Sequence, residues 1–140
     1  MKNLPLMEVF AILVLDNLLY SSEHIWVRVE DELAYIGITD FAQHYMNVIV
    51  YIELPELGLE VEKDSQIGQI EHIKGVSPLF SPISGKIVET NEEVEVDTQL
   101  LQDDPYSNHI AVISIKDKAE LQGLLTADGY KTLCAEIKQD

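Results

Sequence analysis

Short runs of alternating apolar and polar residues, separated by polar or Gly- and Pro-containing turns, fill the chain between residues 26 and 116. Their apolar positions are rich in β-branched and aromatic side chains, which favour strands. The pattern predicts strands at 26–29, 34–38, 48–52, 66–73, 76–80, 86–89 and 110–116. Many short strands with turns at intervals of about 8–12 residues are typical of a sandwich or barrel, so we expect one mainly β domain.

Two segments depart from the strand pattern. The Thr39 hydroxyl can accept an early backbone N–H, which predicts a short helix over 40–46. After residue 116 apolar residues recur at i, i+3 and i+4, first at Leu121, Leu124 and Leu125, so the C-terminal tail is predicted to be helical. Polar turns are expected at 91–93 and 103–105.

The N-terminal segment 4–19 is mostly apolar, but Glu8 and Asp16 interrupt it. Its unbroken run, 9–15, is far shorter than the roughly 20 residues that a helix needs to cross a bilayer. A packed helix or an edge strand is the first interpretation, and a partner-docking segment is the second. A secretion signal is the third, although Lys2 is the only early cation and no small-x-small cleavage pattern follows.

The charge balance excludes several classes of partner. Nine Lys and Arg residues stand against 25 Asp and Glu residues, a formal charge of −16. Nucleic-acid recognition and docking on anionic membranes both need a basic face, so we expect neither. Cys134 is the single cysteine, which rules out an internal disulfide and a C-x-x-C motif. It is interpreted as a small apolar residue on a helix, and a cytoplasmic location is expected.

No catalytic or metal-binding motif is present in the sequence. It contains no G-x-S-x-G, P-loop, G-x-G-x-x-G or H-E-x-x-H pattern. Its four histidines, with no pair at metal-ligand spacing, are His24, His44, His72 and His109. The residues therefore predict neither catalytic residues nor a metal site.

One segment has the pattern of a β-hairpin with a lysine at its tip. Two apolar-alternating arms flank Lys74 and Gly75, and Gly75 can supply the positive φ of a tight turn. Pro78 cannot donate a ladder hydrogen bond, so the second arm is predicted to be an edge strand. Lys74 is the only cation between Lys63 and Lys86. An ordinary surface lysine is the alternative interpretation.

Several separate stretches form an ordered set of motifs along residues 20–130. They are Tyr20-Ser-Ser-Glu-His-Ile-Trp-Val27, Ile36-Gly-Ile-Thr-Asp-Phe-Ala-Gln43, Ile52-Glu-Leu-Pro-Glu-Leu-Gly58, Glu71-His-Ile-Lys74, Ser81-Pro-Ile-Ser-Gly-Lys-Ile-Val-Glu89 and Asp104-Pro-Tyr106. Together they resemble the H-protein family of the glycine cleavage system. The resemblance implies a barrel-sandwich hybrid, a flattened barrel with a short helix after the first strands and C-terminal helices. The expected organisation is an apolar extension over 1–19, a lipoyl-carrier barrel over 20–117 and a helical segment over 118–140.

The resemblance also implies a function. Lys74 falls on the lysine to which lipoate is attached, and Glu71 on a position where the family carries Glu near that lysine. Two interpretations of Glu71 stay open, recognition of the hairpin by the lipoylating enzyme and a solvated strand carboxylate. The protein would be a non-catalytic carrier that shuttles an aminomethyl group between glycine decarboxylase, aminomethyltransferase and dihydrolipoyl dehydrogenase. His24 and Trp26 match the family's E-H-x-W element, where packing and a buried hydrogen bond are expected rather than catalysis.

The sequence departs from the family pattern around Lys74 and also at 47–48, at 107–110 and in the apolar extension before Tyr20. His72, Gly75 and Pro78 stand where the resemblance leads us to expect Ser or Thr, Ala and an acidic residue. Two alternatives therefore stay open. One is an H-like lipoate-binding protein of another pathway, either sulfur oxidation with a heterodisulfide-reductase-like complex or a regulatory lipoylation target. The other is an interaction module in which Lys74 is unmodified.

Overall fold

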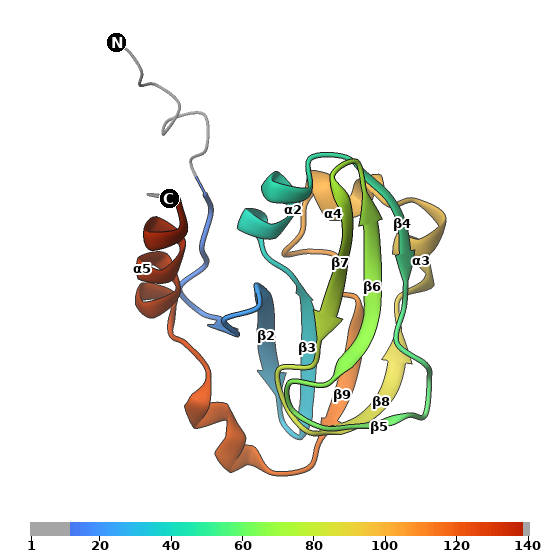
Figure 1. Cartoon of the computed structure of the whole chain (residues 1–140). Coiled ribbons are helices and arrows are strands. Elements are labelled where there is room, and N and C mark those ends of the chain that lie inside the picture. Colours follow the sequence, from blue (N-terminus) through green and yellow to red (C-terminus); the bar gives the residue numbers. More distant parts are fainter. Residues whose placement is uncertain (1–11, 139–140) are drawn as a thin grey trace.

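The computed structural model describes residues 12–138, which form two antiparallel sheets packed face to face, with helices at one end and along one side (Figure 1). The six-stranded sheet has the order β1-β2-β3-β9-β8-β5, and the three-stranded sheet has the order β4-β6-β7. The strands are β1 (Leu19–Tyr20), β2 (Ile25–Glu30), β3 (Leu33–Ile38), β4 (Ile49–Glu53), β5 (Glu60–Val61), β6 (Gln66–His72), β7 (Gly75–Phe80), β8 (Gly85–Thr90) and β9 (Ala111–Ile115). The expected mainly β fold class is confirmed. Within residues 12–138 no ladder joins the two sheets, so the flattened barrel is not closed.

The main core lies between the two sheets. Alternate residues of each strand point inward, as the period of two requires. Ile36 on β3, Ile70 on β6, Ile87 on β8 and Ile113 on β9 are all buried in one cluster. Burying such a side chain contributes about 1.5–3 kcal/mol, so this cluster fixes how the small sheet sits on the large one.

Two short helices lie at the end of the sandwich at which β6 meets β7, and a third lies beside β4 (Figure 1). The predicted helix over 40–46 is confirmed as α2 (Asp40–Met46), where the Thr39 hydroxyl accepts the Ala42 N–H. The turn predicted at 91–93 is wrong, because Asn91 caps α3 (Glu92–Val96). The turn expected at 103–105 begins one residue late, since Asp103 ends α4 (Gln99–Asp103). Both short helices insert a fully buried apolar side chain into the core.

The C-terminal tail is helical, as predicted, and its helix is interrupted. A 3₁₀ helix, η1 (Lys118–Gly123), is followed by an extended stretch and then by α5 (Ala127–Lys138). The break has a physical cause at Leu125, whose N–H and C=O both bond to the backbone of Tyr20, at 2.7 and 2.9 Å. A helix through Leu125 would lose these two bonds.

A second apolar cluster joins α5 to the large sheet, beside β1 and β2 (Figure 1). Its buried members include Leu18, Tyr20, Trp26 and Tyr130. Residues 12–18 of the N-terminal segment form neither a helix nor a strand, and only its last residue, Leu19, belongs to the edge strand β1. Residues 4–11 of that segment lie outside the described residues, so its interpretation stays a prediction. Among the described residues, no helix is long and apolar enough to cross a membrane. The division of the chain at residues 19 and 117 stays a prediction.

Both edges of the three-stranded sheet are blocked by side chains or by proline. On β4, the Ile49 N–H donates to Gln102 Oε1 at 3.1 Å, and the Thr98 hydroxyl donates to the Ile49 carbonyl at 3.0 Å. Gln102 also donates to the Asn47 carbonyl. On β7, Pro78 carries no N–H, which confirms the predicted edge strand.

Candidate functional site

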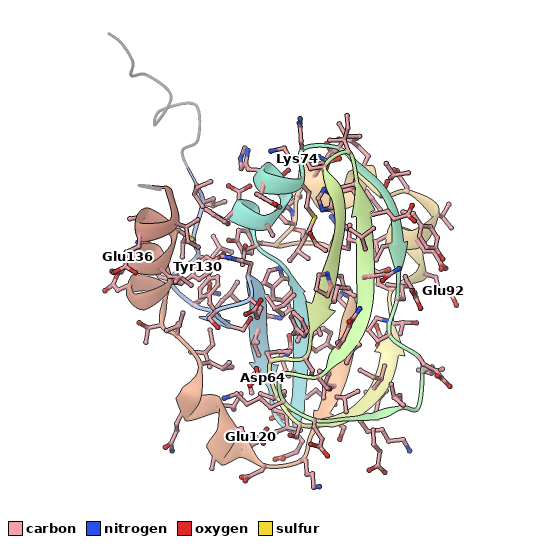
Figure 2. The ribbon with its side chains drawn as sticks, in the orientation of Figure 1. Asp64, Lys74, Glu92, Glu120, Tyr130 and Glu136 are labelled. Carbon is pink, nitrogen blue, oxygen red and sulfur yellow. The ribbon has the colours of Figure 1, made fainter. Side chains whose placement is uncertain are left out.

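The hairpin of β6 and β7 places Lys74 at the outermost point of its turn. The last pair of the ladder is His72 with Gly75, so Ile73 and Lys74 alone form the connection. Gly75 has a φ of +144°, which a residue with a Cβ rarely adopts. The hairpin predicted from sequence is therefore confirmed, with both arms ending within one residue of the expected positions. Figure 2 shows the Lys74 side chain extending from the end of the molecule into solvent.

The Lys74 ammonium group is exposed and lies over one aromatic ring. Its Nζ is 5.2 Å from the centroid of the Tyr45 ring on α2. Within residues 12–138 no carboxylate pairs with Lys74. A cation–π contact at an exposed site is worth about 0.5–1 kcal/mol, so the amine is free to leave it. Such a lysine is accessible to a modifying enzyme.

Glu71 lies three residues before Lys74, on the outer face of the small sheet. It is exposed and stands opposite Tyr51 on β4 and Val76 on β7. Ile73, two residues further along, is 65% exposed, and Val76 is 55% exposed. The carboxylate of Glu71 makes no ion pair with another described residue. An apolar patch of Tyr51, Ile73 and Val76 with one carboxylate at its centre thus borders the lysine.

His72 is on the opposite side of the strand and is 8% exposed. Its Nδ1 accepts the backbone N–H of Lys74 at 3.3 Å, and its Nε2 is 2.8 Å from the Ser77 hydroxyl on β7. The Tyr45 ring packs edge-on against it, with the centroids 6.0 Å apart. Burial and the nearby charge of Lys74 both lower the pKa of His72. The ring therefore connects the turn to both arms of the hairpin and to α2.

A cavity of about 300 Å³ lies between β7, α2 and the start of β2, a feature that sequence reasoning missed. Its polar side chains are Glu23, His24 and Ser77. The rest of its wall is mostly apolar and comes from Ile25, Ile38, Phe41, Ala42, Tyr45, Met46, Pro78, Leu79, Phe80 and Ile137. Phe41 and Tyr45 stand four residues apart on one side of a helix, which was the available signal. Because Tyr45 also contacts Lys74, the cavity begins beside the hairpin tip.

His24 and Trp26 make the buried hydrogen bonds expected of them. The Trp26 indole N–H donates to the Pro105 carbonyl at 3.0 Å. His24 Nδ1 is 2.8 Å from the Tyr130 hydroxyl, and its ring stacks on Phe41 with the centroids 4.7 Å apart. Burial lowers the pKa of His24, so its neutral form is favoured. His24 is thereby fixed in the wall of the cavity.

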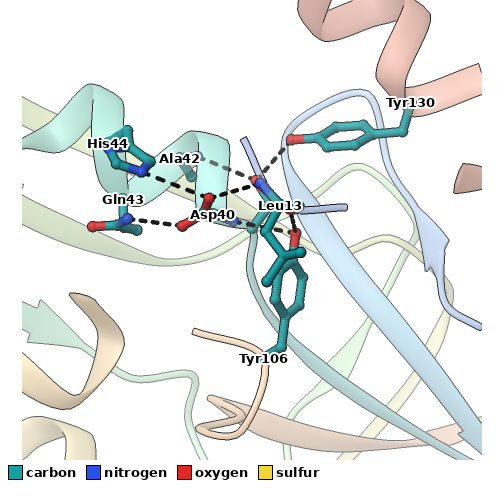
Figure 3. A network of polar contacts seen from close by, with 8 residues as sticks. Leu13, Asp40, Ala42, Gln43, His44, Tyr106 and Tyr130 are labelled. Atoms are coloured by element: carbon teal, nitrogen blue, oxygen red, sulfur yellow. Dashed lines mark hydrogen bonds and ion pairs between the residues drawn. The ribbon is translucent and has the colours of Figure 1, made fainter. Parts of the chain in front are cut away.

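The tyrosines of the second cluster hold the terminal segments in place (Figure 3). The Tyr130 hydroxyl is 2.7 Å from Thr39 Oγ1, and burial raises the pKa of Tyr130 well above its usual value. The Tyr106 hydroxyl donates to the Leu13 carbonyl at 2.6 Å, while Asp40 accepts the Leu13 N–H at 2.8 Å. These contacts connect α5 and the chain before β1 to the first turn of α2.

No metal centre is found in the part of the chain that the structure describes. No group of three or more His, Cys, Asp or Glu side chains lies close enough together there to hold a metal ion.

Comparison with known proteins gives the same family at the levels of sequence and structure. The family described as Glycine cleavage H-protein matches residues 18–137. The glycine cleavage system H protein of Thermoanaerobacter sp. (strain X514) is 45% identical over 123 residues, which cover 88% of this chain and 98% of the relative. The protein of the same name from Clostridium botulinum (strain Hall) is 46% identical over 127 residues, or 91% of this chain and 98% of the relative.

A solved structure extends the likeness to the fold. The crystal structure of a glycine cleavage system H protein from Mycobacterium marinum matches with a TM-score of 0.76 and 28% sequence identity. The match covers 85% of this chain and 97% of that one. The chain belongs to the glycine cleavage H-protein family.

Proposed function

We propose that this protein is the lipoyl carrier of a glycine cleavage system, with lipoate joined as an amide to Nζ of Lys74. The observation that carries the proposal is the exposed lysine, free of any carboxylate partner among the described residues, at the tip of a two-residue turn. When bound, lipoate would supply a disulfide that accepts the aminomethyl group, and the dithiol left after transfer would be oxidised back to the disulfide by dihydrolipoyl dehydrogenase. The protein itself is proposed to be non-catalytic and to act in the cytoplasm.

The contribution of the chain is to present the arm from a fixed point. The β6–β7 ladder runs from the Gln66–Phe80 pair to the His72–Gly75 pair, and β4 supports β6 on the other side. A support of this kind keeps the attachment atom in one place, so that the arm alone has to move between partner active sites.

The side chains next to the acceptor fit an arm that is apolar along its length. The cavity beside β7 begins at Tyr45, and its wall contains Phe41 and Leu79. Aromatic rings make favourable contacts with sulfur. We propose that these residues hold the arm against the protein between encounters, and that the loss of the Lys74 charge on amide formation releases the contact with Tyr45.

The proposed partners are glycine decarboxylase, aminomethyltransferase, dihydrolipoyl dehydrogenase and a lipoylating enzyme. The patch of Tyr51, Ile73 and Val76 with Glu71 offers them an apolar surface around one carboxylate. The formal charge of −16 speeds encounter with a basic cleft and makes the encounter rate fall as salt rises. Glu71 is proposed to pair with a cation of the lipoylating enzyme.

The test is the mass of the protein and of its peptides after co-expression with a lipoylating enzyme and lipoate. A gain of one lipoyl amide, mapped to Lys74, is expected in the natural chain and in Lys86→Arg, which changes an exposed lysine on β8. No gain is expected in Lys74→Arg. An unmodified Lys74 beside a modified control carrier would overturn the proposal and favour an interaction module. Glycine–carbonate exchange with a glycine decarboxylase then tests the pathway, since a carrier for another pathway would not support it.

A further inference from the structure

We propose that His72 is a positioning residue for Lys74, whose neutral ring, with its proton on Nε2, clamps the turn that presents the lysine. The inference rests on the proposed function only in taking Lys74 as the attachment point. His72 is the last residue of β6, and its side chain contacts the turn, β7 and α2 together through Lys74, Ser77 and Tyr45.

The hydrogen bonds of the ring determine where its proton lies. The backbone N–H of Lys74 is only a donor, so Nδ1 must offer it a lone pair. In the neutral ring the proton is then on Nε2, which donates to the Ser77 hydroxyl 2.8 Å away. Protonation of Nδ1 would set two N–H groups against each other and break the bond to the turn. The clamp is therefore present when His72 is neutral and lost when it is charged.

The groups around the ring favour the neutral form. On its own hairpin the charged neighbour is Lys74, whose positive charge opposes a second one. Neither Ser77 on β7 nor Ile49, the cross-strand neighbour of His72 on β4, carries a charge. Tyr45 on α2 faces the His72 ring with an aromatic edge. Glu71 is the adjacent carboxylate, but it is on the other face of the strand.

Modification of Lys74 changes this balance. An amide at Nζ has no charge, so one of the two causes that lower the pKa of His72 disappears while burial remains. The pKa of His72 is expected to rise on modification, because the positive charge that opposes protonation of the ring is gone. The clamp then opens at a higher pH in the modified carrier than in the unmodified one.

The first experiment is an NMR titration of the unmodified protein. The ring nitrogens of His72 should show the Nε2–H tautomer, and the backbone amide of Lys74 should titrate with the same midpoint as the ring. In His72→Asn the side-chain oxygen can replace Nδ1 as acceptor but does not titrate, so the Lys74 amide should lose its pH dependence. In His109→Asn, which changes a histidine paired with Glu89, the Lys74 titration should be unchanged. An Nδ1–H tautomer, or a Lys74 amide that ignores the His72 midpoint, would overturn the proposal.

The second experiment measures lipoylation of the unmodified chain by a lipoate ligase between about pH 5 and 8. At low concentration of the carrier, we compare the lipoylation rate of the natural chain with that of His72→Asn at the same pH. The ratio of the two rates should fall several-fold as His72 becomes protonated, because the ligase then binds a loosened turn. His72→Phe should raise KM and leave kcat near that of the natural chain, whereas His72→Asn should restore KM. A ratio that is flat with pH would refute the positioning role. If Lys74 accepts no lipoate at all, the proposed function fails, while the NMR titration still decides the clamp.

Discussion

Replacing Tyr130 by Phe should weaken the attachment of α5 while leaving the ring packing intact. The hydroxyl is the single atom lost, and it bonds to Thr39 Oγ1 at 2.7 Å and to His24 Nδ1 at 2.8 Å. The stack of Tyr130 on Tyr20, with ring centroids 4.6 Å apart, is kept in the variant. The substitution therefore isolates the polar part of this interface.

The magnitude follows from the two hydrogen bonds. Each contributes about 1 kcal/mol net, and a buried partner left unpaired adds to the cost. In the variant Thr39 Oγ1 still accepts the Ala42 N–H, whereas Nδ1 of His24 loses its hydrogen bond to the Tyr130 hydroxyl. We expect the free energy of unfolding to fall by about 2 kcal/mol. With an unfolding entropy of about 2.1 cal/mol/K per residue, a chain of 140 residues should lose about 7 °C in Tm.

The assay is thermal and urea unfolding, with Tyr51→Phe as the matched control. Tyr51 is 45% exposed, and its hydroxyl has no hydrogen bond among the described residues, so its loss should change the free energy by less than about 0.5 kcal/mol. A double-mutant cycle with Thr39→Val should give a coupling of about 1 kcal/mol. If Tyr130→Phe costs no more than the control, the network does not hold α5 and the reasoning is refuted.

Three further predictions concern other parts of the molecule. Gly85→Ala should lower the free energy of unfolding by about 3 kcal/mol, because a Cβ there meets the Ser114 carbonyl and the Ile113 side chain. Gly58→Ala, where there is open space but a φ of +87°, should lower it by about 1 kcal/mol. Urea unfolding measures both. Glu120→Ala removes the carboxylate that accepts the Ser84 N–H at 2.7 Å and its hydroxyl at 3.0 Å, so we expect a loss of about 2 kcal/mol, against almost none for the exposed Glu136→Ala. His24 has a pKa lowered by burial, so its contribution to stability is complete above about pH 6.5 and is lost as pH falls toward the folded-state pKa, at up to about 1.4 kcal/mol per pH unit. Tm should fall less steeply below pH 6.5 in His24→Gln, and parallel curves would contradict that assignment.

The hairpin was predictable because its determinants are local. Alternating apolar residues predict both strands of the hairpin, and Gly75 can adopt the positive φ of the turn. Pro78 has no N–H to donate, so its strand has to lie at the edge of the sheet. The same holds for α2, whose cap at Thr39 is one residue from its first turn. Lys74 was found through a family motif and through its place at the tip, and its role stays a proposal.

The features that the sequence did not predict depend on distant contacts. Asn91 is equally suited to a turn and to a helix cap, and the buried Val94 decides for the helix only once the sheets are assembled. The break at Leu125 depends on Tyr20, more than 100 residues away. The cavity beside β7 combines side chains from β2, α2, β7 and α5, so no single stretch of sequence contains it. Which strands belong to which sheet also depends on contacts between distant parts of the chain.

The blocked edges of the small sheet have a consequence for the protein in crowded solution. Unpaired strand edges are templates on which a second chain can add a strand and begin an aggregate. Here Thr98 and Gln102 occupy the backbone of β4 at Ile49, and Pro78 interrupts the donors of β7. A hairpin that protrudes with a lysine at its tip is thus a poor template for fibrils. The small sheet is therefore less prone to add a strand from a second copy of the chain.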